Sequence, residues 1–198
     1  MRKKEAVIFD WGGVLIDNPN KKMFNYLSNY FGVDQKGLIA FYRNNCNKAL
    51  QIGVDEEKIW EDLYEKFKID GSKKPKIWKE AVENSFVDRQ EVWDFVAELR
   101  EKGYKTGFLS NTERGAVEYF FEKKYDKFFD ATVFSCDEGM VKPDERIYRI
   151  TLDRLEVKPN EAVFVDDKKE NIDAAEKIGI AGILFREVED IAKISAII

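Results

Sequence analysis

Polar side chains stand at several points of the sequence where a short apolar stretch ends. They are Asp10 after Ala6–Phe9, Ser110 and Asn111 after Thr106–Leu109, Asp166 and Asp167 after Ala162–Val165, and Lys142 a little beyond Ala131–Phe134. Carboxylates, a hydroxyl and a lysine can together bind a divalent cation and a phosphate dianion. These residues are the strongest candidates for chemistry in the chain.

Three aspartates that converged without a counter-ion would repel one another, so a divalent cation is expected among them. Its ligands would be oxygen atoms alone, which favours Mg²⁺ over zinc. The sequence has no histidine, which excludes Ser-His-Asp and Cys-His hydrolysis and histidine-ligated zinc. The chemistry must therefore rest on carboxylates, lysine and hydroxyls, together with a hard cation.

The two glycines that follow Asp10 suggest how one carboxylate could react. Gly12 and Gly13 allow the backbone to curl close to a metal ion and a phosphate group without Cβ clashes. The cation and Lys142 could neutralise the phosphate oxygens, while Ser110 donates a hydrogen bond to them. A carboxylate that faces a phosphorus atom so neutralised can attack it and form an aspartyl-phosphate. We expect Asp10 to have that role.

Apolar strands that alternate with amphipathic helices predict an α/β fold, with a parallel sheet covered on both faces. Strands are expected at Ala6–Phe9, Thr106–Leu109, Ala131–Phe134, Ala162–Val165 and Ile180–Phe185. Helices are expected around Val92–Leu99, Ile147–Leu155 and Ile172–Ile178, with Asp144 as an N-cap and Gly103 and Gly179 at C-terminal ends. In open α/β sheets, ligands bind beyond the carboxyl ends of the strands, where the candidate residues would meet.

Residues 18–90 interrupt this alternation, because apolar residues recur there at helical spacing and no strand is evident. The helical stripes are Met23, Leu27, Tyr30 and Phe31; Trp60, Leu63, Tyr64 and Phe67; and Trp78, Ala81 and Val82. The sequence thus predicts a core made of residues 1–17 and 91–198, and a helical insert made of residues 18–90.

Composition limits the class of protein. The chain has 198 residues, of which 44% are hydrophobic, and 33 basic against 38 acidic side chains give a net charge of −5. We expect no nucleic-acid partner, because there is no basic excess. We expect no membrane partner either, because no apolar run approaches the roughly 20 residues of a spanning helix.

The N-terminal apolar stretch is too short for a secretory signal, which favours a cytoplasmic protein. Cys46 and Cys136 are expected to be reduced thiols, since only two cysteines occur and they are far apart in sequence. The expected oligomeric state is a monomer or a homodimer.

Four segments occur in the order and at the strand ends that characterise one known family. They are FDWGGVL at Phe9–Leu15, LSNT at Leu109–Thr112, GMVKP at Gly139–Pro143 and FVDDKKEN at Phe164–Asn171. These segments resemble the four motifs of the haloacid dehalogenase-like hydrolases, and the insert resembles the small α-helical cap of subfamily I. The resemblance implies a three-layer Rossmann-like core, Mg²⁺ as cofactor, an aspartyl-phosphate on Asp10 and small phosphorylated metabolites as substrates.

The resemblance also implies a role for each matching residue. Asp10 would be the nucleophile, and Lys142 would be the second catalytic residue. Phosphate would be bound by Ser110, Asn111, Lys142, Gly12 and Gly13, and the metal by Asp10, Asp166, Asp167 and the carbonyl of Gly12. We expect Asp167 to be the main second ligand, with Asp166 close behind or reaching the metal through water.

Gly12 departs from the pattern of this family's phosphatases, which carry an aspartate there as general acid and base. Such help is worth about 10²–10⁴-fold, on the order of 3–5 kcal/mol. The substrate could have a good leaving group, as an anomeric sugar phosphate does; members resembling the α-glucose-1-phosphate phosphatases share this D-x-G form. Alternatively Asp17 or an insert residue could replace the acid, or the chemistry could be lost.

The working hypothesis is a Mg²⁺-dependent phosphatase of small metabolites, sugar phosphates among them. The alternative is a catalytically impaired phosphate-binding or regulatory protein. The acidic pair Asp166 and Asp167 argues against the dehalogenase branch of the family. A signalling receiver domain is disfavoured because receivers lack a long helical insert, and their acidic pair precedes the phosphorylated aspartate.

Overall fold

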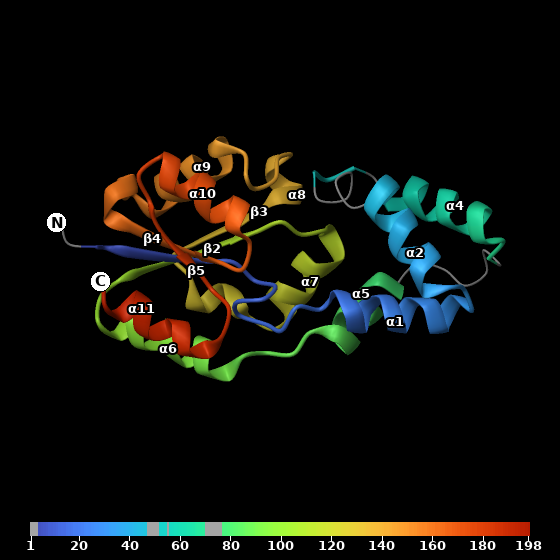
Figure 1. The fold of residues 1–198 in the computed structure, drawn as a ribbon, viewed down its shortest axis with the longest axis horizontal. Coiled ribbons are helices and arrows are strands. Elements are labelled where there is room, and N and C mark those ends of the chain that lie inside the picture. The colour runs from blue at the N-terminus through green and yellow to red at the C-terminus, as the bar shows by residue number, and fades with distance from the viewer. Residues whose placement is uncertain (1–3, 47–51, 55, 70–76) are drawn as a thin grey trace.

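The core of the molecule is a five-stranded parallel sheet, in a computed structural model that describes residues 4–46, 52–54, 56–69 and 77–198 (Figure 1). The strands are β1 (Ala6–Phe9), β2 (Lys105–Ser110), β3 (Ala131–Phe134), β4 (Ala162–Asp166) and β5 (Ala181–Leu184). Their order is β3-β2-β1-β4-β5. All five predicted strands are confirmed, and Ser110 and Asp166 prove to be the last residues of their strands.

Helices cover both faces of the sheet, as Figure 1 shows. On one face lie α6 (Gln90–Glu101), α7 (Arg114–Glu122) and α11 (Ile191–Ser195); on the other lie α9 (Glu145–Leu155) and α10 (Lys169–Lys177). The short elements are α8 (Ser135–Glu138) and the 3₁₀ turns Tyr125–Phe128, Pro159–Glu161 and Val188–Asp190. The expected three-layer α/β core is therefore confirmed.

Strand β1 explains why the apolar runs are continuous. Val7 and Phe9 belong to the hydrophobic cluster that includes α6 and α7, whereas Ala6 and Ile8 belong to the cluster that includes α9 and α10. Successive side chains of a strand point to opposite faces, and both faces of this strand are covered, so every position must be apolar. The first polar residue, Asp10, then falls at the carboxyl edge of the central strand.

The predicted helix ends are also confirmed. The Asp144 carboxylate accepts a hydrogen bond from the N–H of Arg146 at 3.0 Å, as an N-cap does. Gly103 after α6 and Gly179 after α10 have φ angles of +83° and +95°, which residues other than glycine rarely adopt.

Residues 18–90 contain the helices α1 (Asn20–Phe31), α2 (Gln35–Phe41), α4 (Glu56–Phe67) and α5 (Ile77–Ser85), and a π-helical turn at Tyr42–Cys46. Figure 1 shows them together at one end of the molecule, beyond the strand ends. The described part of this segment holds no strand, apart from a bridge at Asp88.

The predicted apolar stripes lie on helices of the structure, and most of their described residues are buried. Met23, Leu27, Phe31, Leu63, Ala81 and Val82 are buried, and Tyr64 and Phe67 are half-buried. Tyr30 is 37% exposed and stacks on Tyr26 at the surface. The side chains of Trp60 and Trp78 lie outside the described residues.

The two segments that connect the helical insert to the core run side by side. The N–H of Asp17 donates to the carbonyl of Val87, and the N–H of Arg89 donates to the carbonyl of Leu15, each at 2.9 Å. The Arg89 side chain bonds Asp17 at 3.1 Å and the carbonyl of Gly13 at 2.7 Å. These contacts tie both connections to the glycine turn that follows β1.

Within the described ranges, no helix is long and apolar enough to cross a membrane. Cys136 is a free and buried thiol, as expected, and burial raises its pKa to about 11. The side chain of Cys46 lies outside the described residues.

Candidate active site

The carboxyl ends of three adjacent strands bring the predicted polar residues together. Strand β1 lies between β2 and β4, so Asp10, Ser110 and Asp166 stand at one edge of the sheet. The N–H of Asp10 continues the ladder by donating to the carbonyl of Val165 at 2.9 Å. All three side chains are buried. The geometry therefore confirms that these residues converge, and their chemical roles are considered below.

Lys142 reaches this edge from the loop after α8 and is 4% exposed. Its Nζ atom lies 2.8 Å from Oδ1 of Asp10 and 2.7 Å from Oδ2 of Asp166, and it donates to the carbonyl of Leu109 at 2.9 Å. An ammonium group has three donors, and these three acceptors account for all of them. The lysine is thus locked in one orientation against Asp10.

Burial and charge determine how Asp10 and Lys142 ionise. Burial raises the pKa of Asp10 to about 7, with Lys142 opposing that shift and Asp166 adding to it. Burial by itself would lower the pKa of Lys142, but Asp10 and Asp166 outweigh it and the pKa is raised. A cluster of two buried carboxylates, one half-buried carboxylate and one lysine retains an excess of negative charge, which a divalent cation would relieve.

The two neighbouring aspartates after β4 are used differently. Asp166 accepts hydrogen bonds from the Nδ2 of Asn171, at 3.0 Å to each oxygen, and from the N–H of Lys168 at 2.8 Å, in addition to Lys142. In Asp167, by contrast, Oδ1 is buried without a hydrogen-bond partner in the described structure. Burial and the charge of Asp166 raise the pKa of Asp167.

Asp10, Asp166 and Asp167 offer oxygen atoms that all lie within 4.8 Å of one another. A buried carboxylate oxygen without a partner is costly unless a cation or water satisfies it. An all-oxygen donor set of this kind suits Mg²⁺. The residues present therefore fit the expected cation, and Asp167 has the oxygen best placed to bind it.

The turn after β1 requires glycine at position 13 but not at position 12. At Gly13, where φ is +88°, a Cβ would lie 2.5 Å from Oδ2 of Asp167, so the turn needs glycine to admit that carboxylate. At Gly12 a Cβ would meet only the Cδ of Pro19, at an ordinary 3.5 Å. A side chain at position 12 is therefore sterically possible, and Gly12 lines the cavity described next.

The side chain of Asn111 contacts Lys142, and the phosphate-binding role of this residue stays a prediction. Its Nδ2 donates to the carbonyl of Lys142 at 2.9 Å, and its Oδ1 accepts from the N–H of Lys142 at 2.8 Å. Both ends of the amide are thus occupied by the backbone of the lysine. The side chain of Asn111 positions Lys142, and any phosphate contact would have to come from its main chain.

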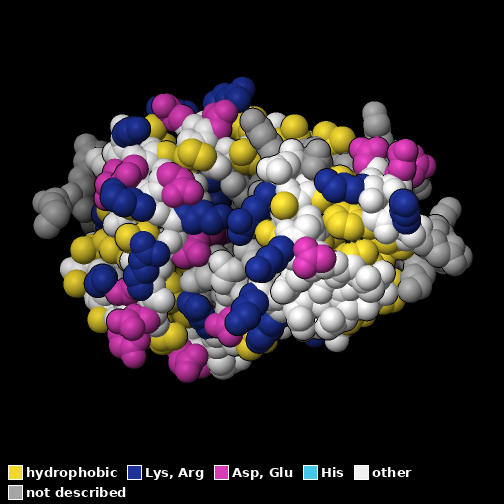
Figure 2. Space-filling view, turned by 45° about the vertical axis from the view of Figure 1, so that its right-hand side comes forward, with side chains coloured by type: hydrophobic (Ala, Val, Ile, Leu, Met, Phe, Trp, Pro, Cys, Tyr) yellow, Lys and Arg dark blue, Asp and Glu magenta, His cyan; other side chains and the backbone are white. Residues whose placement is uncertain are grey.

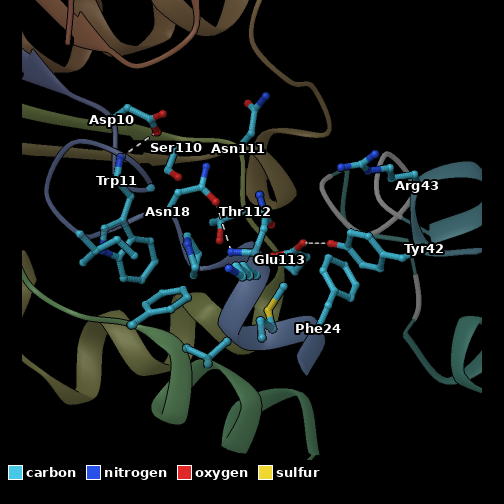
Figure 3. Close-up of a pocket in the computed structure, with 18 of the residues that line it drawn as sticks. Asp10, Trp11, Asn18, Phe24, Tyr42, Arg43, Ser110, Asn111, Thr112 and Glu113 are labelled. Carbon is cyan, nitrogen blue, oxygen red and sulfur yellow. Dashed lines mark hydrogen bonds between the residues drawn. The ribbon is translucent and has the colours of Figure 1, made fainter. Parts of the chain in front are cut away.

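A cavity of about 430 Å³ lies between the strand ends and the helical insert (Figure 3). The core contributes Asp10, Trp11, Gly12, Ser110, Asn111, Thr112, Glu113, Lys142 and Lys168, and the insert contributes Met23, Phe24, Tyr42, Arg43 and Val82, among others. The Tyr42 hydroxyl donates to Oε1 of Glu113 across the cavity (Figure 3). The site therefore has walls from both parts of the chain.

Asp17, which we considered as a substitute for the missing acid, faces elsewhere. Its carboxylate pairs with Nε of Arg89 at 3.1 Å, its side chain is 50% exposed, and it does not line the cavity. Among the described lining residues, the carboxylates are those of Asp10 and Glu113. Glu113, and not Asp17, is therefore the carboxylate that lines the cavity together with Asp10.

Sequence reasoning missed several residues that the fold brings to the site. Lys168 lines the cavity and belongs to the fourth motif, so its position was a usable signal. Asn171 of the same motif had no assigned role, and its side chain donates hydrogen bonds to Asp166. Tyr42, Arg43 and Glu113 gave no such signal, because their proximity depends on how the insert packs against the core.

A parallel α/β sheet that carries three aspartates and a lysine at its carboxyl edge, beside a cavity, is typical of α/β enzymes with an acidic site. The chain belongs to the haloacid dehalogenase-like hydrolases, since the sequence model of that hydrolase family matches residues 4–179. The resemblance recognised in the four motifs is thereby confirmed at the level of the family.

Three relatives illustrate the sequence similarity to other proteins. The chain is 30% identical over 190 residues to "Acyl-CoA dehydrogenase family member 10" of Mus musculus, with 90% of this chain covered but only 18% of the mouse protein's length. It is 30% identical to "Pyrophosphatase PpaX" of Bacillus cereus, with 88% of this chain and 79% of that protein covered. It is 29% identical to "Phosphorylated carbohydrates phosphatase" of Thermotoga maritima, with 90% and 83% covered.

Solved structures support the fold. A HAD family enzyme from Bacteroides thetaiotaomicron, in complex with magnesium and inorganic phosphate, superposes with a TM-score of 0.76 at 21% identity. The superposition covers 90% of this chain and 92% of the other. At this identity, the likeness is one of fold.

Proposed function

We propose that the protein is a Mg²⁺-dependent phosphatase of small phosphorylated metabolites that acts through an aspartyl-phosphate on Asp10. The observation that carries this proposal is the buried contact of 2.8 Å between Asp10 and Lys142 at the floor of the cavity, beside the unpartnered oxygen of Asp167. An anionic nucleophile held beside a fixed lysine is suited to attack at phosphorus.

The family and its named members support this reaction class. Two of the relatives are a pyrophosphatase and a phosphatase of phosphorylated carbohydrates. The structure from Bacteroides thetaiotaomicron contains both magnesium and inorganic phosphate. These names favour phosphate esters or anhydrides over halogenated acids as substrates of this chain.

Mg²⁺ would be held by Asp10, Asp167 and the carbonyl of Gly12, with Asp166 direct or through water. When bound, it would neutralise the phosphoryl oxygens as a Lewis acid. Lys142 would contribute a second positive charge beside the nucleophile. The N–H of Trp11 and the Nζ of Lys142 both donate to Oδ1 of Asp10, at 2.7 Å and 2.8 Å, and so fix the rotation of the carboxylate.

In the first step a carboxylate oxygen of Asp10 would form a bond to phosphorus as the bond to the leaving oxygen breaks. Ser110, with the turn at Gly12 and Gly13, would hold the phosphoryl oxygens during the transfer. In the second step water would attack the phosphorus, release inorganic phosphate and restore the carboxylate.

We propose further that residues 18–90 form a cap over a core made of residues 1–17 and 91–198. The cavity supports this division, because its walls come from both parts and Tyr42 of the insert bonds Glu113 of the core. A cap of this kind excludes water during transfer and contacts the leaving group.

Gly12 determines which leaving groups suit this site. Without an acid at position 12, substrates whose leaving oxygen needs little protonation are favoured, and sugar 1-phosphates are the first to test. The alternative, a phosphate-binding protein with impaired catalysis, rests on the same residue. The phosphate-release screen described next decides between the two.

The test is a phosphate-release screen over sugar phosphates, nucleotides, pyrophosphate and phosphorylated acids, with Mg²⁺ or with EDTA. We expect turnover that needs Mg²⁺ and falls at least about 10³-fold in Asp10→Asn, since the nucleophile is removed. Asp94→Asn, an exposed carboxylate on α6, is the matched control. Activity that survives Asp10→Asn would refute the nucleophile, and no turnover on any substrate would favour the phosphate-binding alternative.

A further inference from the structure

Three basic side chains line the cavity without an ion pair in the described structure. They are Lys21 and Arg43, which come from the helical insert, and Lys168, which comes from the core. Figure 2 shows Lys and Arg side chains gathered in the middle of this face of the molecule, between its two parts. A substrate that enters the cavity therefore meets more positive charge than the buried Lys142 alone supplies.

Lys168 and Arg43 lie at different ends of the cavity. Lys168 acts electrostatically on Asp10 and Asp167, so it lies at the phosphoryl end. Arg43 lies on the side of the insert: in Figure 3 it extends from the insert toward the cavity, and Asn111 stands between it and Asp10. A group bound by Arg43 would thus be a part of the substrate other than the phosphoryl group on Asp10.

The position of Arg43 is fixed by its neighbour in the chain. Tyr42 is 8% exposed, donates to Glu113 of the core, and packs edge-on against Phe24 with ring centroids 5.1 Å apart. Because Tyr42 is anchored to both parts of the molecule, the backbone at Arg43 is held over the cavity although its side chain is exposed.

We propose that Arg43 binds a second anionic group of the substrate. The enzyme would then act on small metabolites that carry a phosphate or carboxylate in addition to the phosphoryl group transferred. A guanidinium matches either anion with two parallel hydrogen bonds, and a cavity of about 430 Å³ accommodates a molecule of metabolite size. This inference rests on the proposed phosphatase function, because it assigns the other end of the same substrate.

Binding of non-hydrolysable phosphonates tests this inference without turnover. The probes are alkane diphosphonates of two to six carbons, the alkylphosphonates of equal length, and the corresponding carboxyalkylphosphonates, titrated calorimetrically in the presence of Mg²⁺. We expect the best-fitting diphosphonate or carboxyalkylphosphonate to bind about tenfold or more tightly than the alkylphosphonate of equal length, which lacks the second anion. One charge-assisted hydrogen bond predicts a gain of this size. The carboxylate series shows which of the two anions is preferred.

Variants at Arg43 and its neighbourhood identify the residue responsible. Arg43→Gln should remove most of the tenfold advantage of the second anion. Lys22→Gln is the matched control, because Lys22 adjoins Lys21 on α1 but lines a separate surface hollow, and it should keep the advantage. If no second anion improves binding at any length, or if Arg43→Gln weakens both members of each pair equally, the inference is wrong.

The phosphate-release screen separates this result from the proposed function. Turnover without any preference for a second anion would refute the role of Arg43 and leave the phosphatase standing. A preference for diphosphonates that depends on Arg43, in a protein that hydrolyses no phosphate ester, would support the second anion site and refute the phosphatase.

Discussion

Gly13→Ala should weaken Mg²⁺ binding by pushing Asp167 out of place. Position 13 has φ of +88°, and an alanine Cβ there would stand 2.5 Å from Oδ2 of Asp167 and 2.7 Å from its Cγ. The carboxylate would have to move by about 0.9 Å (3.4 − 2.5) to reach an ordinary contact. Mg²⁺ demands near-ideal geometry at about 2.0–2.1 Å, so a shift of this size removes Asp167 as a ligand.

The size of the effect can be estimated in two parts. The left-handed backbone costs alanine about 1–2 kcal/mol, which lowers the melting temperature by about 2–8 °C in a chain of this length. The displaced carboxylate adds a loss in Mg²⁺ affinity of about 10–100-fold, comparable to disturbing the groups that orient metal ligands.

Gly103→Ala separates these two parts. Gly103 has nearly the same φ, +83°, but a Cβ there would meet nothing within 4 Å. This control should lose about the same stability in EDTA and keep the wild-type affinity for Mg²⁺. The measurements are thermal unfolding in EDTA and calorimetric titration with Mg²⁺ for both variants.

A double-mutant cycle with Asp167→Ala completes the test. Because alanine at 167 lacks the two closest atoms, the extra destabilisation by Gly13→Ala should shrink toward that of Gly103→Ala, and no further Mg²⁺ affinity should be lost. If Gly13→Ala binds Mg²⁺ as tightly as Gly103→Ala does, the assignment of Asp167 as the main ligand is wrong.

Three further predictions follow from the geometry of the site. In EDTA, the pKa of Asp10 is raised from 3.8 to about 7 in the folded state, so the folded protein binds a proton that the unfolded chain releases. The contribution of this group to the free energy of unfolding is therefore present at low pH and is lost as the pH rises from about 4 to 7. Asp10→Asn should flatten that loss, and the Mg²⁺-induced rise in melting temperature should be larger at pH 8 than at pH 5.5; equal rises would contradict this. Gly12→Asp, whose Cβ would meet only Pro19 at an ordinary distance, should raise turnover on alkyl phosphates by about 10-fold or more. Sugar 1-phosphates are the comparison substrates, and unchanged turnover on alkyl phosphates would mean that protonation of the leaving group is not limiting. Asn111→Ala should lower kcat about 10-fold by releasing the loop that carries Lys142. A rise of about 10-fold in the KM for phosphate esters with kcat unchanged would instead indicate that Asn111 binds the substrate directly.

The parts of the fold that depend on local pattern could be predicted from the sequence. Strands buried on both faces must be continuously apolar, and chain polarity then puts Asp10, Ser110 and Asp166 at one edge. The convergence of the site therefore follows from periodicity and topology alone. The helix N-cap at Asp144 could be predicted for the same reason, since its hydrogen-bond partner Arg146 is two residues away in the chain.

The direction in which a side chain points could not be predicted in the same way. Asn111 lies at a strand end like a phosphate ligand, yet its amide is bound by Lys142, 31 residues later in the chain. Asp17 is close to Asp10 in sequence, but Arg89 holds it outside the cavity. In both cases the deciding partner comes from a distant segment, and no spacing rule encodes that approach.

The difference between the two glycines of the turn bears on what the substrate must provide. Gly13 is required by the carboxylate of Asp167, whereas Gly12 has room for a side chain and faces the cavity. The missing acid at position 12 is therefore not a consequence of packing. Asp17 is turned away and Glu113 is bonded to Tyr42. In the phosphatase that we propose, the leaving group would therefore have to stabilise by itself the charge that develops on its oxygen. An anomeric phosphate with a distal anion held by Arg43 would meet that condition and would also account for the cations of the insert.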